Sequence, residues 1–70
     1  MKHTFENSSS LHSCEYDEKC KELTIHFHSG SSHCYKGVQK ESVEALKQAA
    51  SPGSHFHAAI RGRYQSEKIK

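Results

Sequence analysis

An alternating run of apolar and polar residues near the middle of the chain constrains the fold more than any other feature. Leu23, Ile25 and Phe27 alternate with polar residues, and a period of two is typical of a β-strand with one buried face. Gly30 follows shortly and can supply the positive φ that a tight hairpin turn needs. Residues 31–36 then return as a second strand. The central part of the chain is therefore predicted to be a β-hairpin.

Two registers of this hairpin are compatible with the sequence. With a two-residue turn, Ile25 lies opposite Cys34, and His33 and Tyr35 face away from the core. With a three-residue loop and a bulge at Gly30, Ile25 lies opposite His33, and both His33 and Tyr35 lie on the buried face. A slip of one residue exchanges the two faces of a strand. The hairpin residues alone leave both registers open.

A further strand precedes the hairpin, at residues 11–16. Its Leu11 is out of phase with Cys14 and Tyr16, so we expect a bulge or a bend near residues 12–13. The prediction is an antiparallel meander of three strands at residues 11–16, 21–28 and 31–36.

Helical spacing follows the meander. Val43 and Leu46 belong to an apolar stripe with steps of three and four, so residues 39–50 are predicted to form an α-helix. Ser54 is expected to cap a short second helix. The fold class is therefore α+β: a three-stranded antiparallel β-meander packed by one α-helix plus a short C-terminal helix. The predicted core comprises Leu23, Ile25, Phe27, Val38, Val43, Leu46, Phe56 and Ile60.

Length and composition indicate one small domain. Seventy residues are enough for a single core, and we assign residues 1–8 to a flexible leader, 9–64 to the domain and 65–70 to a flexible tail. The leader lacks the apolar region of a secretory signal, and three cysteines are an odd number, so we expect free thiols in the cytoplasm. No apolar stretch approaches the ~20 residues of a membrane span.

The most specific stretch is residues 51–64, SPGSHFHAAIRGRY. It resembles the C-terminal S-x-G-x-Y-F-N-x-x-I-R-x-x-Y signature of the KTSC domain family, and the likeness extends over residues 9–64. Members of this family occur at the C-terminus of some lysyl-tRNA synthetases and as stand-alone bacterial and phage proteins. The resemblance implies an association with RNA and favours the bulged register of the hairpin.

This chain departs from the family pattern at two places. The family's Y-x-Y is His33-Cys34-Tyr35 here, and its Y-F-N is His55-Phe56-His57. A function that depended on the first tyrosine or on the asparagine would therefore lack its residue in this protein.

No catalytic motif is present, so we expect a non-enzymatic binding module without a cofactor. The first hypothesis is binding of RNA or single-stranded nucleic acid. Arg61 and Arg63 would contact phosphates, because the planar guanidinium group binds phosphate oxygens with two hydrogen bonds. Tyr35, Tyr64 or His33 would stack on unpaired bases if their rings are exposed.

Two alternatives to this hypothesis stay open. In the first, Arg61 is structural: it pairs with a carboxylate such as Asp17 or Glu15 and thereby holds the C-terminus to the sheet. In the second, the protein is an interaction module, such as a small phage or bacterial adaptor or inhibitor. It would then bind a host protein, or a second copy of itself, through a sheet edge or a histidine-rich face.

Histidine and cysteine supply further candidates. His26, His28 and His33 are a metal-binding alternative, although their spacing differs from that of structural zinc sites. The preferred interpretation is a polar sheet face that happens to contain histidine. Free cysteines are most often packing residues, and we expect Cys20, near a turn, to be the reactive one.

Overall fold

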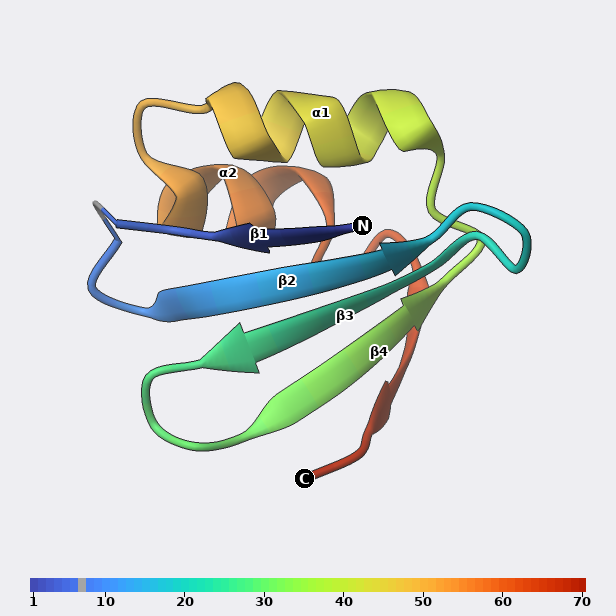
Figure 1. The fold of residues 1–70 in the computed structure, drawn as a ribbon, viewed down its shortest axis with the longest axis horizontal. Helices are drawn as coiled ribbons and strands as arrows, with labels where there is room; N and C mark the ends of the chain where they lie inside the picture. The colour runs from blue at the N-terminus through green and yellow to red at the C-terminus, as the bar shows by residue number, and fades with distance from the viewer. Residues whose placement is uncertain (7) are drawn as a thin grey trace.

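The structure is a computed structural model that describes residues 1–6 and 8–70. Residue 7, in the predicted leader, lies outside the described residues. The elements, in chain order, are β1 (Lys2–Thr4), β2 (Leu11–Asp17), β3 (Glu22–Phe27), β4 (Ser32–Lys36), α1 (Lys40–Gln48), α2 (Pro52–Ala59) and β5 (Gln65–Lys68). The strands form one antiparallel sheet in the order β1-β2-β3-β4-β5. Both helices pack on the same face of this sheet (Figure 1).

The α+β class is confirmed, but the predicted number of three strands is wrong. Strand β1 lies in the segment assigned to the leader, and β5 lies in the segment assigned to the tail. All four residues of β5 are exposed, so this strand is held by backbone pairing with β4 rather than by buried side chains. A strand of this kind has no apolar alternation and therefore cannot be recognised from the side-chain pattern.

The hairpin of β3 and β4 adopts the bulged register. Ile25 lies opposite His33 and Leu23 lies opposite Tyr35, while Gly30 has a φ of +98°. Directly opposed residues share a face of the sheet, so His33 and Tyr35 lie on the face that the helices cover. This is the register that the family resemblance favours.

The predicted irregularity in the first strand is also confirmed. Leu11 pairs with Phe27 and Ser13 pairs with His26, which leaves His12 as the extra residue. The bulge brings Leu11 onto the same face as Cys14, and both are buried. The out-of-phase apolar residue thus reaches the core without breaking the strand.

The core lies between the covered face and the two helices. It consists of Phe5, Leu11, Cys14, Tyr16, Leu23, Ile25, Tyr35, Val38, Val43, Leu46, Phe56 and Ile60. All the predicted core residues belong to this set except Phe27, which is partly buried at its edge. The two tyrosines were not among the predicted core residues, and both are only 4% exposed.

The helices differ from prediction at their ends. Helix α1 is shorter than residues 39–50, and α2 begins at Pro52 with Ser51 rather than Ser54 at the N-cap. Proline suits the first turn of a helix because its missing N–H would have no partner there. Neither helix in the described part of the chain has the length and apolar character needed to cross a membrane.

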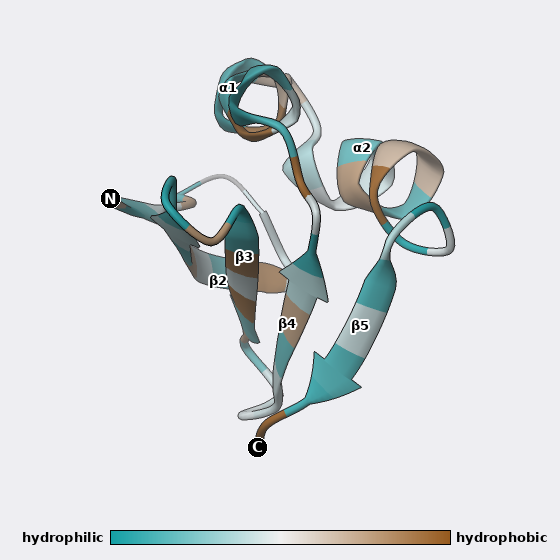
Figure 2. Ribbon diagram, turned by 90° about the vertical axis from the view of Figure 1, so that its right-hand side faces the viewer, coloured by the Kyte–Doolittle hydropathy of each residue, from teal (hydrophilic) through white to brown (hydrophobic). Residues whose placement is uncertain are grey.

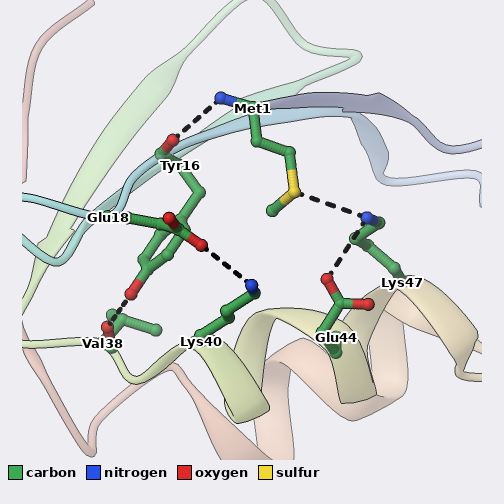
Figure 3. Close-up of polar contacts among 7 residues, drawn as sticks. All are labelled: Met1, Tyr16, Glu18, Val38, Lys40, Glu44 and Lys47. Atoms are coloured by element: carbon green, nitrogen blue, oxygen red, sulfur yellow. Dashed lines mark hydrogen bonds and ion pairs between the residues drawn. The ribbon is translucent and has the colours of Figure 1, made fainter.

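Tyr16 joins the sheet to the segment that leads into α1 (Figure 3). Its hydroxyl donates a buried hydrogen bond of 2.7 Å to the carbonyl of Val38. The amino group of Met1 donates to the carbonyl of Tyr16 at 3.1 Å, and Lys40 at the start of α1 pairs with Glu18 at 3.1 Å. The C-terminal end of β2 is therefore connected to both β1 and α1.

Candidate functional site

An open cleft of about 260 Å³ lies between the β3–β4 hairpin and the C-terminal part of α2. We call it the α2 cleft. Its lining comes from the hairpin and from α2 with the turn that follows, and consists of Phe27, Ser29, Ser31, His33, Tyr35, Phe56, His57 and Arg61. The cleft therefore brings together three of the predicted site residues from distant parts of the chain: His33, Tyr35 and Arg61.

The inner part of the cleft is aromatic. The ring centroids of Tyr35 and Phe56 are 5.4 Å apart, and those of Phe27 and Phe56 are 5.6 Å apart, both in edge-to-face arrangements that aromatic rings prefer. Tyr35 and Phe56 are 4% and 1% exposed. The exposed ring that stacking on a base requires is therefore not present at Tyr35.

His33 is better placed for such a contact. It is half-buried, lies edge-to-face against Phe27 with centroids 5.5 Å apart, and is 6.5 Å from the ring of Tyr35. Its imidazole and the partly buried Phe27 ring are aromatic groups of the cleft that keep some exposed surface.

Arg61 supplies the positive charge of the cleft. Its backbone N–H bonds to the carbonyl of Phe56 at 2.9 Å, which holds the residue against the end of α2. Its side chain is exposed, and its Nη1 donates to Nδ1 of His57 at 3.3 Å. The guanidinium group is therefore anchored on the helix and open to solvent.

The predicted ion pair between Arg61 and Asp17 or Glu15 is wrong. Among the described residues, Arg61 has no carboxylate within ion-pair distance. Glu15 lies on the uncovered face of the sheet and binds Nε2 of His26 at 2.9 Å, and this hydrogen bond is the main reason why the pKa of Glu15 is lowered. Glu15 is therefore engaged on the face opposite to the helices, whereas Arg61 lies at the end of α2.

The hydroxyl of Tyr35 differs from other buried polar groups of the protein. No hydrogen bond to it is found within the described part of the chain. The hydroxyl is not fully buried, and Tyr35 is one of the residues that line the α2 cleft. Burial raises the pKa of this phenol, and the nearby Arg61 guanidinium lowers it by a smaller amount. The net increase keeps the group a neutral O–H donor at physiological pH.

The other two predicted site residues, Arg63 and Tyr64, lie in a different hollow between α1 and α2. Arg63 is exposed. Tyr64 is half-buried, and its hydroxyl is 3.2 Å from Oγ of Ser42 on α1. The structure thus separates the predicted set into two groups, one inside the α2 cleft and one outside it.

Phe27, Phe56 and His57 belong to the cleft but were not predicted as site residues. One signal was present in the sequence: His57 and Arg61 are four positions apart, the spacing of neighbours on a helix. Phe56 was predicted only as a core residue, which it also is.

The histidines proposed as a metal site do not come together. His26 pairs with Ser32 across the hairpin, so it lies on the uncovered face, whereas His33 lies on the covered face. His28 is in the hairpin loop, with Nε2 3.1 Å from the carbonyl of Ser8. Within residues 1–6 and 8–70, no group of three metal-binding side chains is found.

The cysteines occupy three different environments. Cys14 is buried on the covered face, Cys34 is half-buried on the uncovered face, and Cys20 is exposed in the turn between β2 and β3. The Asp17 carboxylate raises the pKa of Cys20, which lowers its thiolate fraction. The exposure of the Cys20 thiol thus favours its predicted reactivity, whereas the negative charge of Asp17 opposes it.

Comparison with known proteins gives relatives of two kinds. The chain is 38% identical to an uncharacterized protein of Stutzerimonas stutzeri (strain A1501), covering 91% of this chain and 90% of that protein. It is 39% identical to part of a lysine–tRNA ligase of Nostoc punctiforme, covering 77% of this chain and 10% of the ligase. The chain therefore corresponds in length to the first relative and to one small segment of the second.

A solved structure has the same fold. The crystal structure of a KTSC domain protein from Yersinia pestis superimposes with a TM-score of 0.89 at 28% sequence identity, covering 100% of this chain and 97% of that one. The family model of the KTSC domain matches residues 7–64, a stretch that contains β2 to α2 and the whole α2 cleft. The resemblance found in the sequence is confirmed: the chain belongs to the KTSC domain family.

Proposed function

We propose that this KTSC domain is a non-enzymatic module that binds single-stranded RNA or DNA in the α2 cleft. One observation carries the proposal: Arg61 is exposed, has no carboxylate partner among the described residues, and lies at the opening of an aromatic cleft. A guanidinium group in this position can bind a phosphate, while the rings beside it can contact a base. These are the two kinds of contact that single-stranded nucleic acids need.

The charge around the cleft supports this proposal. Among the described residues, no carboxylate lines the cleft. Lys68 of β5 lies opposite His33, so its side chain is on the same face of the sheet. The acidic residues Glu15, Asp17, Glu18 and Glu22 line another hollow beside the β2–β3 turn, which is at the opposite end of β3. A phosphate at the cleft would therefore meet no lining carboxylate, whereas at the other hollow it would meet four carboxylates together with Lys2 and Lys19.

The edges of the sheet do not favour the alternative function, a protein-interaction module that binds a partner through a sheet edge. Strands β1 and β5 are three and four residues long, and each contains at least one lysine. Short edge strands with charged side chains disfavour pairing with a further strand. The match to lysine–tRNA ligases, enzymes whose substrate is an RNA, adds support for nucleic acid, although it involves one tenth of the ligase.

The test is a titration of fluorescently labelled single-stranded RNA and DNA with the wild type, Arg61→Ala and Arg63→Ala. Arg63 is the matched control, because it is an exposed arginine two positions away that lies outside the cleft. We expect Arg61→Ala to weaken binding about tenfold or more, since hydrogen bonds to charged groups are the strong ones. Arg63→Ala should change the affinity less than about threefold on the same scale.

Salt dependence provides a second readout. The plot of log affinity against log salt between about 50 and 200 mM should be less steep for Arg61→Ala, by about 0.7 for each phosphate that the variant no longer binds. Equal effects of the two arginine variants would show that the cleft is not the site. Absence of binding at low salt, where phosphate contacts are strongest, would overturn the proposed function.

A further inference from the structure

We propose that the α2 cleft takes up one unstacked base at a time and that the Tyr35 hydroxyl distinguishes between bases through a hydrogen bond. This inference rests on the proposed function, because it concerns the ligand of the same cleft. It adds a residue role: Arg61 would supply affinity for any sequence, and Tyr35 would supply the preference for a base.

The size of the cleft favours a single base. Its volume of about 260 Å³ is smaller than the ~300–1,000 Å³ of pockets for drug-sized ligands. It therefore has room for one ring system rather than for several nucleotides. The rest of an oligonucleotide would remain outside, where Arg61 and Lys68 are exposed.

The unpartnered hydroxyl of Tyr35 points to a ligand with polar edges. Tyr16 and Tyr35 are equally buried, at 4% exposure, but the Tyr16 hydroxyl is bonded to the Val38 carbonyl at 2.7 Å. The Tyr35 hydroxyl has no hydrogen-bond partner among the described residues and keeps some accessible surface, and Tyr35 is one of the residues that line the cleft. Because this hydroxyl keeps accessible surface, a ligand atom that accepted its proton would take the place of water as its hydrogen-bond partner.

The surroundings of this hydroxyl match the chemistry of a nucleobase. The rings of Phe27 and His33, 5.5 Å apart, retain exposed surface on which a flat ring can pack. The Tyr35 hydroxyl then meets an edge of that ring, where the bases differ in their carbonyl oxygens, ring nitrogens and amino groups. A ligand without such an edge would fill the cleft but leave the hydroxyl unpaired.

The charge of the phenol agrees with a donor role. Its raised pKa keeps the phenol neutral in the neutral pH range, so it can donate to a keto oxygen or a ring nitrogen and can also accept a hydrogen bond. Arg61 lines the same cleft as Tyr35, so we infer that it contacts the phosphate of the nucleotide whose base is inside the cleft.

The experiment compares labelled RNA oligomers of equal length made of one base each, together with an oligomer of abasic sugars, against three proteins. For the wild type we expect affinities that differ between bases by about threefold to tenfold, the range of one hydrogen bond. Tyr35→Phe should reduce this spread to less than about twofold and retain the salt dependence. Tyr64→Phe, which removes a hydroxyl bonded to Ser42 outside the cleft, should leave the spread unchanged.

The outcomes separate this inference from the proposed function. Binding that depends on Arg61 but is equal for all bases and for the abasic oligomer would overturn the inference and leave the proposed function in place. An unchanged spread in Tyr35→Phe would also overturn it, because another group would then distinguish the bases. If no oligomer binds at low salt, the proposed function fails and this inference fails with it.

Discussion

The two faces of the sheet share one backbone but differ in the polarity of their side chains. The covered face, on which α1 and α2 pack (Figure 2), is apolar and aromatic and includes Leu23, Ile25 and Tyr35. The uncovered face is polar, and some of its side chains are bonded to one another. There His26 contacts Ser32 at 2.7 Å through Nδ1 and Glu15 at 2.9 Å through Nε2.

The comparison explains where a ligand site can arise. On the uncovered face the polar side chains can form hydrogen bonds with one another or with water, so they do not need a ligand as a hydrogen-bond partner. On the covered face the helices bury most of the aromatic groups. Beside the β3–β4 hairpin the helices cover the sheet incompletely, and Phe27 is only partly buried there. The α2 cleft is this incompletely covered part of the core, and its lining includes Tyr35, whose hydroxyl has no partner among the described residues.

The largest difference between the two faces should appear in core stability. Leu23→Ala removes a fully buried side chain and should lower the free energy of unfolding by about 2–5 kcal/mol. Thr24→Ala changes the neighbouring residue on the uncovered face and should cost less than about 1 kcal/mol. Urea denaturation followed by circular dichroism measures both. Equal losses would mean that the two faces contribute similarly to the stability of the sheet.

If Leu23→Ala fails to fold, Ile25→Val provides a milder test of the same comparison. Ile25 is also fully buried, and the loss of one methylene group should cost about 0.5–1.5 kcal/mol.

A smaller difference is expected between two tyrosines of the covered face. Tyr16→Phe removes the donor to the Val38 carbonyl and should lower the free energy of unfolding by about 1–2 kcal/mol, because a buried acceptor loses its partner. Tyr35→Phe removes a hydroxyl with no partner in the described chain and should change stability by less than about 0.5 kcal/mol. Thermal or urea denaturation compares the two variants. A loss in Tyr35→Phe as large as that in Tyr16→Phe would argue against a free hydroxyl in the cleft.

The smallest effect concerns the thiols of the two faces. Burial raises the pKa of Cys14 from 9.0 to about 11, so we expect this covered-face thiol to resist alkylation in the folded protein. Cys34, half-buried on the other face, should react sooner. Single-cysteine variants with serine at the other two positions, followed by mass spectrometry, measure the two rates. Faster labelling of Cys14 than of Cys34 would contradict the assignment of faces.

The same shift affects stability at high pH. The folded pKa of Cys14 is higher than the unfolded one, so unfolding releases a proton between pH 9.0 and about 11, and stability should fall as the pH rises through this window. A Cys14→Ala variant should lack this component of the alkaline loss.

Much of the fold could be predicted because it follows from side-chain burial. The alternation around Ile25 identified the hairpin, and the displaced Leu11 required a bulge, which the structure contains. Strands β1 and β5 escaped prediction because backbone hydrogen bonds at the sheet edges hold them, and such bonds leave no trace in the pattern of apolar residues.

The candidate site was predicted in part. His33, Tyr35 and Arg61 were named from the sequence and do meet in one cleft. Arg63 was assigned to the same site, but it lies beyond Gly62, whose φ of +84° belongs to the turn that ends α2. The residue type alone predicted that both arginines could bind phosphate. Only the path of the chain after α2 places Arg61 in the cleft and Arg63 outside it.

The sequence by itself determined the α+β class, the hairpin, the helices and the family, since each depends on residues close together along the chain or on a continuous motif. The tertiary structure decided that the Tyr35 ring is buried while its hydroxyl keeps some accessible surface and has no partner among the described residues. It also decided that Arg61 faces the cleft rather than a carboxylate of the sheet. These features depend on contacts between β4 and the end of α2, and contacts between distant segments are established only when the chain packs.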